Sequence, residues 1–374
     1  MLLRPRLFAS RHGADGALRR LRGLARIEAA LLVAVAVLTA LAAAGRYVSG
    51  FSHVGAFVLA TLALAGQAWI VSLCADQVGR RLGPSLTGVL QATVGNLPEF
   101  FVVLFALQAR ERTVAETAII GSILVNALLV LGLVLVVGSL RSPNTLMRFS
   151  AKLPNDTATL LLVASFIIVL VGLVDATGDP ASHHTRAISV VGAVAILVVY
   201  AVWLRQYLTS PESRDRPSEP ARLGMPAAIG LLVLAGAASA LTSDWFIHAL
   251  RPTIHTLHIS QAFAGLVIVS IAGNAVENVA GIVMAAKGRA NLAISIVKNS
   301  VAQIAAFLYP VLVLVSLLTA SHLTFAIPPV YIGALFGTAV LVWQITGDGE
   351  ATPFEGVALI ATFVILATVA AFER

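Results

Sequence analysis

The chain has 374 residues, of which 58% are apolar and only 11% are charged. A soluble domain usually carries about 25% charged residues, so this composition excludes a soluble protein and predicts an all-α polytopic membrane protein surrounded by a lipid bilayer. The excess of seven basic charges is spread among loops rather than gathered into one patch, which excludes a nucleic-acid partner. The only cysteine, Cys74, excludes a disulfide framework and a Cys-based metal cluster.

Eleven segments are long and apolar enough to cross the hydrocarbon core, which takes about 20 residues of helix. In chain order they are residues 27–45, 54–75, 85–108, 114–138, 158–175, 187–208, 225–243, 259–286, 290–318, 329–346 and 354–372. The segment before them holds seven arginines and no cleavage-site pattern, so we interpret it as a cytoplasmic arm.

The distribution of Lys and Arg predicts the orientation of these spans. With a cytoplasmic N-terminus and one crossing per span, 18 of the 25 basic residues face the cytoplasm and six face outside, while Lys298 lies within a span. This pattern predicts an integral protein of the cell (inner) membrane with its C-terminus outside. Two loops disagree with it, because residues 109–113 are basic yet outside and residues 347–355 are acidic yet inside.

A short motif occurs twice in the sequence. Residues 95–99 read GNLPE and residues 273–277 read GNAVE, so Gly, Asn and Glu recur at equivalent positions, and the step from Gly95 to Gly273 defines a repeat interval. The two spans that carry the motif cross in opposite directions, which predicts two inverted five-helix repeats with a site between them at the membrane midplane. The predicted division is an arm and first helix (1–53), a first repeat (54–208), a cytoplasmic linker (209–224) and a second repeat (225–374).

Glu99 and Glu277 are the acidic residues that fall well inside predicted spans. A carboxylate at this depth costs at least about 2.5–3.5 kcal/mol, so such residues pair, bind a cation or carry a proton. For a single glutamate, a neutral hydrogen-bonded side chain between helices is an adequate alternative, but the matched pair favours a cation site. Helix unwinding next to them, which would free carbonyl ligands, is expected at Gly95, Gly273 and Pro98.

Other polar residues in these spans have the oxygen atoms that a hard cation such as calcium prefers. The expected ligands besides the two glutamates are Asn96, Asn274, Ser122, Asn126, Asn299, Ser300 and Gln303, with Ser270 extending the second stripe. For each of them alone, hydrogen bonding between helices is an equal alternative. All eight histidines fall in predicted loops or near span ends, which argues against a transition-metal site.

These motifs resemble those of the calcium/proton antiporters of the cation/proton exchanger family, within the calcium/cation antiporter superfamily. The resemblance rests on GNLPE followed by GSILVNALLVLG (121–132), and on GNAVE followed by AQIAAFLYPVLVL (302–314). It implies a secondary active antiporter that exchanges Ca²⁺ for H⁺ by alternating access, without a cofactor. The cation-binding glutamates of the family correspond to Glu99 and Glu277.

This sequence departs from the family pattern at the second motif. Asn278 stands where the family has His, and Asn299 begins a run that the family writes Gly-Ser-Ser-x-Gln. Lys298 precedes that run, either as a lysine whose ammonium reaches the interface or as a charge modulator near Glu277. A sodium-coupled exchanger and a cation channel are the alternative functions. An enzyme is not expected, because no nucleophile–base pair lies at membrane depth.

Overall fold

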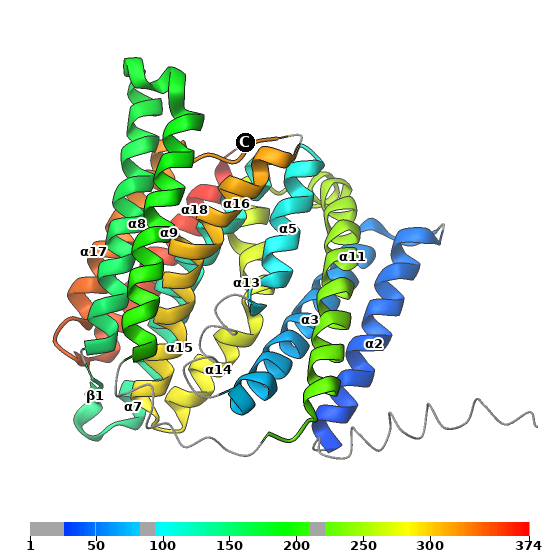
Figure 1. The fold of residues 1–374 in the computed structure, drawn as a ribbon, viewed down its shortest axis with the longest axis horizontal. Helices are drawn as coiled ribbons and strands as arrows, with labels where there is room; N and C mark the ends of the chain where they lie inside the picture. Colours follow the sequence, from blue (N-terminus) through cyan, green and yellow to red (C-terminus); the bar gives the residue numbers. More distant parts are fainter. Residues whose placement is uncertain are drawn as a thin grey trace, which may run out of the picture.

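The computed structural model describes residues 26–48, 50–82, 94–150, 152–209, 221–319 and 321–373, and this part is almost entirely helical (Figure 1). The expected arm and most of the expected linker lie outside the described residues. The α-helices are α2 (Arg26–Tyr47), α3 (His53–Leu82), α5 (Leu97–Gln108), α6 (Arg112–Leu124), α7 (Leu131–Arg141), α8 (Lys152–Thr177), α9 (Thr185–Thr209), α11 (Met225–Leu257), α12 (Gln261–Phe263), α13 (Ser270–Gly273), α14 (Ala275–Ala286), α15 (Ala290–Gln303), α16 (Tyr309–Val315), α17 (Pro329–Thr346) and α18 (Pro353–Phe372).

Shorter elements interrupt or join these helices. Three π-helical turns lie within longer helices, and such turns often mark functional sites. They are η1 (Val125–Val130), η4 (Ala264–Val269) and η5 (Ile304–Leu308). The remaining elements are the 3₁₀ turns η2 (Pro143–Thr145), η3 (Pro180–His184) and η6 (Ser316–Leu318), and the antiparallel strands β1 (Met147–Arg148) and β2 (Glu350–Ala351).

The described residues contain nine helices that are long and apolar enough to cross a membrane. A further pair, Gln261–Gly273 and Ala275–Ala286, meets the same criterion together but bends by 62° at its break. The shorter apolar helix α5 is the described end of the predicted span 85–108. A lipid-exposed segment must satisfy its own backbone groups, which explains why these apolar segments form helices. The chain is therefore a polytopic, all-helical integral membrane protein.

Helix α11 corrects one predicted span, because it continues to Leu257 instead of ending near residue 243. Beyond that point Trp245, Phe246 and Leu250 are buried, whereas Asp244 and His248 lie one helical turn apart on the exposed face. The helix is amphipathic here, and its polar face lowers the average hydropathy. The prediction that this span ends near residue 243, which placed His248 in a loop, was wrong for that reason.

The helices form two end groups around a central layer. At one end α2, α3 and α11 lie side by side, and at the other end α8 packs against α9 and α17 (Figure 1). The Gln67 amide of α3 donates hydrogen bonds to Thr242 of α11 (2.9 Å) and Thr39 of α2 (3.0 Å), which joins the first group. The broken helix α13–α14 lies between these groups, with α5 and α15 beside it (Figure 1).

Ion pairs hold charged residues in or next to the two loops that disagree with the charge pattern. Arg112 pairs with Glu116 at 2.6 Å. Glu350 pairs with Arg148 at 3.0 Å between the two short strands. The orientation of the chain in the membrane stays a prediction.

Backbone conformation recurs at the same repeat interval as the sequence motif. In the hairpin of α5 and α6, the first helix starts, the first helix ends and the second helix starts each one repeat interval before the same points in the hairpin of α14 and α15. Arg110 (φ 61°) and Gly288 (φ 71°) occupy the same left-handed position in the two turns. The next residues, Glu111 (φ −89°, ψ 62°) and Arg289 (φ −91°, ψ 63°), also match. The two hairpins therefore share one local fold.

Close contact between α7 and α18 requires glycine at residue 132. A Cβ atom on Gly132 would lie 2.7 Å from the Gly356 carbonyl oxygen, a backbone atom that cannot rotate away. We predict that Gly132→Ala lowers the free energy of unfolding by about 1–3 kcal/mol through overpacking. Gly337→Ala is the matched control, because a Cβ there meets nothing within 4 Å. Thermal unfolding of both variants in detergent tests this, and equal midpoints would contradict it.

Candidate functional site

Both motifs interrupt a helix at their asparagine. Asn96 (φ −89°, ψ 13°) precedes α5, with Pro98 in the first turn, and Asn274 (φ −104°, ψ 16°) separates α13 from α14. Glu99 and Glu277 consequently lie in the first turns of α5 and α14. The first turn of a helix has unpaired N–H groups and a positive partial charge. Each break therefore places a carboxylate where the backbone stabilises its ionised form.

The Glu99 side chain lies against the helix break of the other motif. It is 2% exposed, and a Cβ atom on Gly273 would lie 3.7 Å from its Cβ. The Asn274 amide nitrogen is 3.5 Å from Glu99 Oε1 and donates a hydrogen bond to Ser122 Oγ at 3.0 Å. Glu99 of the first motif is therefore in contact with the asparagine of the second.

Polar side chains of η1 and α13 donate hydrogen bonds to backbone carbonyls of α6 beside this cluster. The fully buried Asn126 donates a hydrogen bond from its amide to the Ser122 carbonyl at 2.9 Å. Ser270 donates to the Ala118 carbonyl at 2.9 Å, which links α13 to α6. Asn126 lies in the π-helical turn η1, in which the regular i→i−4 bonding of the helix is disturbed.

Several buried oxygen atoms near the motifs have no hydrogen-bond partner among the described residues. Leaving such an atom unsatisfied costs about 1–3 kcal/mol. Six lie on the two hairpins, the π-turn η1 and the helix break: Glu99 Oε2, Asn126 Oδ1, Asn274 Oδ1, Asn278 Oδ1, Asn299 Oδ1 and Ser300 Oγ. All six are oxygens, the ligand type that hard cations prefer. The site is therefore suited to a cation that would satisfy them.

The remaining predicted ligands lie around α14 and α15, which pack against each other. Glu277 is half-buried and close enough to Glu99 for the two carboxylates to interact electrostatically. Ser300 is buried on α15, whereas Asn299 and Gln303 are half-buried. Asn96 is 7% exposed and precedes its helix, so it does not lie on a helix face with Glu99.

Lys298 is buried, with 4% of its surface exposed. Its ammonium donates a hydrogen bond to the Thr346 hydroxyl of α17. The neighbouring small cavity is lined by residues of α8, α15 and α17, including Thr157 and Val342. This position does not fit a lysine whose ammonium reaches water at the interface. A role as a charge modulator remains a prediction.

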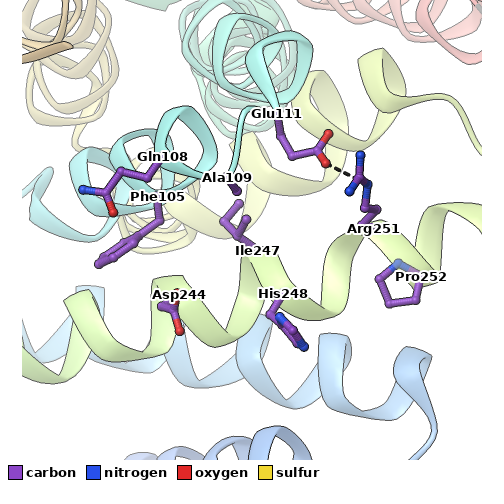
Figure 2. A pocket seen from close by; sticks show the side chains of 9 residues that line it. All are labelled: Phe105, Gln108, Ala109, Glu111, Asp244, Ile247, His248, Arg251 and Pro252. Atoms are coloured by element: carbon purple, nitrogen blue, oxygen red, sulfur yellow. Dashed lines mark ion pairs between the residues drawn. The ribbon is translucent and has the colours of Figure 1, made fainter. Parts of the chain in front are cut away.

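An open pocket of about 510 Å³ lies between α5 and α11 (Figure 2). Asp244 and His248 line it, and Glu111 forms an ion pair with Arg251 at 3.0 Å at its edge (Figure 2). Glu99 is not among the lining residues. The described residues contain no group of three His, Cys, Asp or Glu side chains suited to a metal, so this pocket does not form such a centre.

Sequence reasoning passed over Asn278 as a site residue and noted it only as a departure from the family motif. Its unpaired oxygen belongs to the same set as that of Asn274. The available signal was a polar asparagine directly after Glu277 at membrane depth.

The chain belongs to the sodium/calcium exchanger protein family. The family model matches residues 52–206 and again residues 227–372, which together make up most of the sequence. The two matches coincide closely with the two halves that contain the motifs. The protein is therefore an ion transporter and not an enzyme.

Individual relatives agree with this assignment. The chain is 31% identical to the vacuolar calcium ion transporter of Schizosaccharomyces pombe, over 83% of this chain and 77% of the relative. It is 30% identical to the Ca²⁺/H⁺ antiporter ChaA of Bacillus subtilis, over 76% and 83% of the two chains. The solved structure of native YfkE superimposes with a TM-score of 0.76 at 25% identity, covering 91% of this chain and 99% of that one.

The contact between Glu99 and Asn274 predicts that their substitutions have non-additive effects. Asn274→Leu removes the donor to Glu99. We expect it to lower the free energy of unfolding by about 1–3 kcal/mol, and with it the unfolding temperature. In a chain that already carries Glu99→Leu, the same change should cost clearly less. Gln67→Leu and Thr242→Val, at a hydrogen bond in another part of the fold, form the control cycle. Strict additivity of the Glu99 and Asn274 effects would rule out the contact.

Proposed function

We propose that this protein is a secondary active antiporter that exchanges Ca²⁺ for H⁺ across the membrane by alternating access. The observation that carries the proposal is the buried Glu99 carboxylate at the helix break of the opposite motif, where one oxygen of Glu99 and the side-chain oxygen of Asn274 have no hydrogen-bond partner among the described residues. The names of the relatives, a calcium ion transporter and a Ca²⁺/H⁺ antiporter, support calcium and protons as its substrates.

The two glutamates couple the fluxes by binding either substrate. When ionised, Glu99 and Glu277 hold the cation, with neutral oxygens from Asn96, Asn274, Ser122, Asn126, Asn299, Ser300 and Gln303 completing its shell. When the cation leaves, the neighbouring carboxylates of buried Glu99 and half-buried Glu277 repel each other, and protonation removes their charge. A site with two ionised carboxylates is not left empty in this proposal. The transporter therefore returns to its other orientation only when the site holds protons or a cation. Competition for one pair of carboxylates thus produces exchange.

Two inverted five-helix repeats, residues 54–208 and 225–374, form the moving framework in this proposal. The two matches of the family model and the backbone features that recur at the repeat interval support it. Transporters of this kind bind their substrate at the midplane between repeats. The remaining parts are residues 1–53, with the basic arm and first helix, and the linker 209–224.

The group of α2, α3 and α11 is suited to move as one body. Its helices contact each other extensively and meet the remainder chiefly through α5, α13 and α14, the helices that carry the motifs. Sliding of this group past the motifs would open the site to one side and then the other. We place the N-terminus in the cytoplasm, the C-terminus outside, and the protein in the cell (inner) membrane, on the distribution of basic residues.

The family description favours one alternative, a sodium-coupled calcium exchanger. A sodium gradient would then drive calcium flux, and calcium would move no protons. A cation channel would pass calcium without either countermovement. Asn in the second position of both motifs, Asn96 and Asn274, supports the proton-coupled function through the family resemblance.

We predict that calcium added to one side of proteoliposomes moves protons in the opposite direction, and that Glu99→Gln and Glu277→Gln each reduce this flux at least about 100-fold. A glutamine keeps the shape of the side chain but neither ionises nor carries a proton. Glu350→Gln, an exposed ion-paired glutamate, is the control and should transport normally. Calcium flux driven by sodium alone, or without any countermovement, would replace the proposal by one of its alternatives.

Lys298 provides a separate test of charge near the site. If its ammonium weakens divalent binding, Lys298→Met should lower the half-saturating calcium concentration about three- to tenfold, because like charges repel in a low-dielectric interior. Lys287→Met, at an exposed turn, should leave it unchanged. Calcium-dependent proton flux at several external pH values measures both. Wild-type values for Lys298→Met would show that this lysine only supports packing against α17.

A further inference from the structure

Asn278 lies on the inner face of α14, beside the helix break. The buried residues of this helix are Asn278, Gly281 and Ala285, which recur at helical spacing. A Cβ atom on Gly281 would lie 2.9 Å from Val297 of α15 and 3.4 Å from Val134 of α7. Asn278 is one turn closer to the break on the same face, and it is 9% exposed. Its side chain is therefore directed into the protein and not toward lipid.

The register of the α14–α15 hairpin brings a second oxygen to the same level. The two helices run in opposite directions, because a short turn, 287–289, joins them. Starting from the contact of Gly281 with Val297, one helical turn toward the break on each helix leads to Asn278 and Ser300. Both Asn278 Oδ1 and Ser300 Oγ are buried without a hydrogen-bond partner among the described residues. Glu277 precedes Asn278 in the chain.

The first hairpin has no equivalent of this arrangement. Ser122, which lies one repeat interval before Ser300, accepts a hydrogen bond from Asn274. Ser300 receives no such bond, so the contact is not repeated in the second hairpin. The residue equivalent to Asn278 is Phe100, which contributes no side-chain oxygen. At these two positions the second hairpin has side-chain oxygens without a hydrogen-bond partner, those of Ser300 and Asn278. The first hairpin has the hydrogen-bonded Ser122 and the aromatic ring of Phe100 instead.

We propose that Asn278 is a further cation ligand, whose side-chain carbonyl acts with Ser300 and Glu277 on the transported divalent cation. This inference rests on the proposed antiport and adds a ligand to its site. A neutral amide oxygen adds to the coordination shell without adding charge. Calcium takes 6–8 oxygens in flexible geometry, whereas Mg²⁺ keeps several waters. Asn278 therefore favours calcium over the smaller cation.

The test is calcium-dependent proton flux in proteoliposomes that contain Asn278→Leu, a change of similar volume that removes the oxygen. We expect the half-saturating calcium concentration to rise about tenfold or more, on the scale of a lost metal-site contact, with the maximal rate retained and competition by Mg²⁺ increased. Thr338→Val is the matched control, because it also removes a buried side-chain oxygen without a hydrogen-bond partner, here the hydroxyl of Thr338 on α17. It should transport like the wild type.

Asn278→Asp is the second variant, in case the leucine variant does not fold. It keeps an oxygen in place and adds a charge, so the half-saturating calcium concentration should fall by about threefold or more. An unchanged calcium dependence in whichever variant folds would overturn the inference. If Glu277→Gln still abolishes flux, the proposed function survives that result. If the wild type moves no protons with calcium, the proposed function fails, and calorimetric calcium binding to the wild type and Asn278→Leu tests the ligand directly.

Discussion

The contact of the Glu99 carboxylate with the helix break at Gly273 and Asn274 is the constraint on which the rest of the structure depends. A carboxylate at membrane depth persists only if its surroundings compensate the loss of water. Here the amide of Asn274 is the hydrogen-bond donor, 3.5 Å from Glu99 Oε1. Gly273 lies at van der Waals distance from the Glu99 side chain, and asparagine at the break supplies the donor. The helices are interrupted where the carboxylates need partners.

Packing away from the site allows this arrangement to remain partly unsatisfied. Buried oxygens without partners and π-helical turns both reduce stability locally. The surrounding helices compensate through close contacts at small residues, such as Gly265 against Thr117 and Gly132 against Gly356. Small residues let helices approach closely in a membrane. This matters there because lipid is as apolar as the helices, so burial of apolar surface does not drive helices together. Closely packed helices thus surround polar groups that have no partner among the described residues.

The hairpins α5–α6 and α14–α15 share a backbone but differ in chemistry. Their helix starts and turns recur at the same interval, while the residues at equivalent positions differ, as in Asn126 and Ile304 or Phe100 and Asn278. The hydrogen bond from Asn274 to Ser122 has no counterpart at Ser300. One repeated local backbone thus carries different side chains in the two hairpins.

The sequence by itself determined the class of protein and most helical spans, because a bilayer imposes span length, and it predicted the two glutamates as the site because a bilayer penalises buried charge. The tertiary structure alone decided that Glu99 pairs with Asn274 of the other motif, that α11 continues through Asp244, and that Lys298 is buried against α17. These outcomes depend on which helix faces meet. That choice is made by many weak contacts between segments far apart in the chain, and no local pattern of residues encodes it.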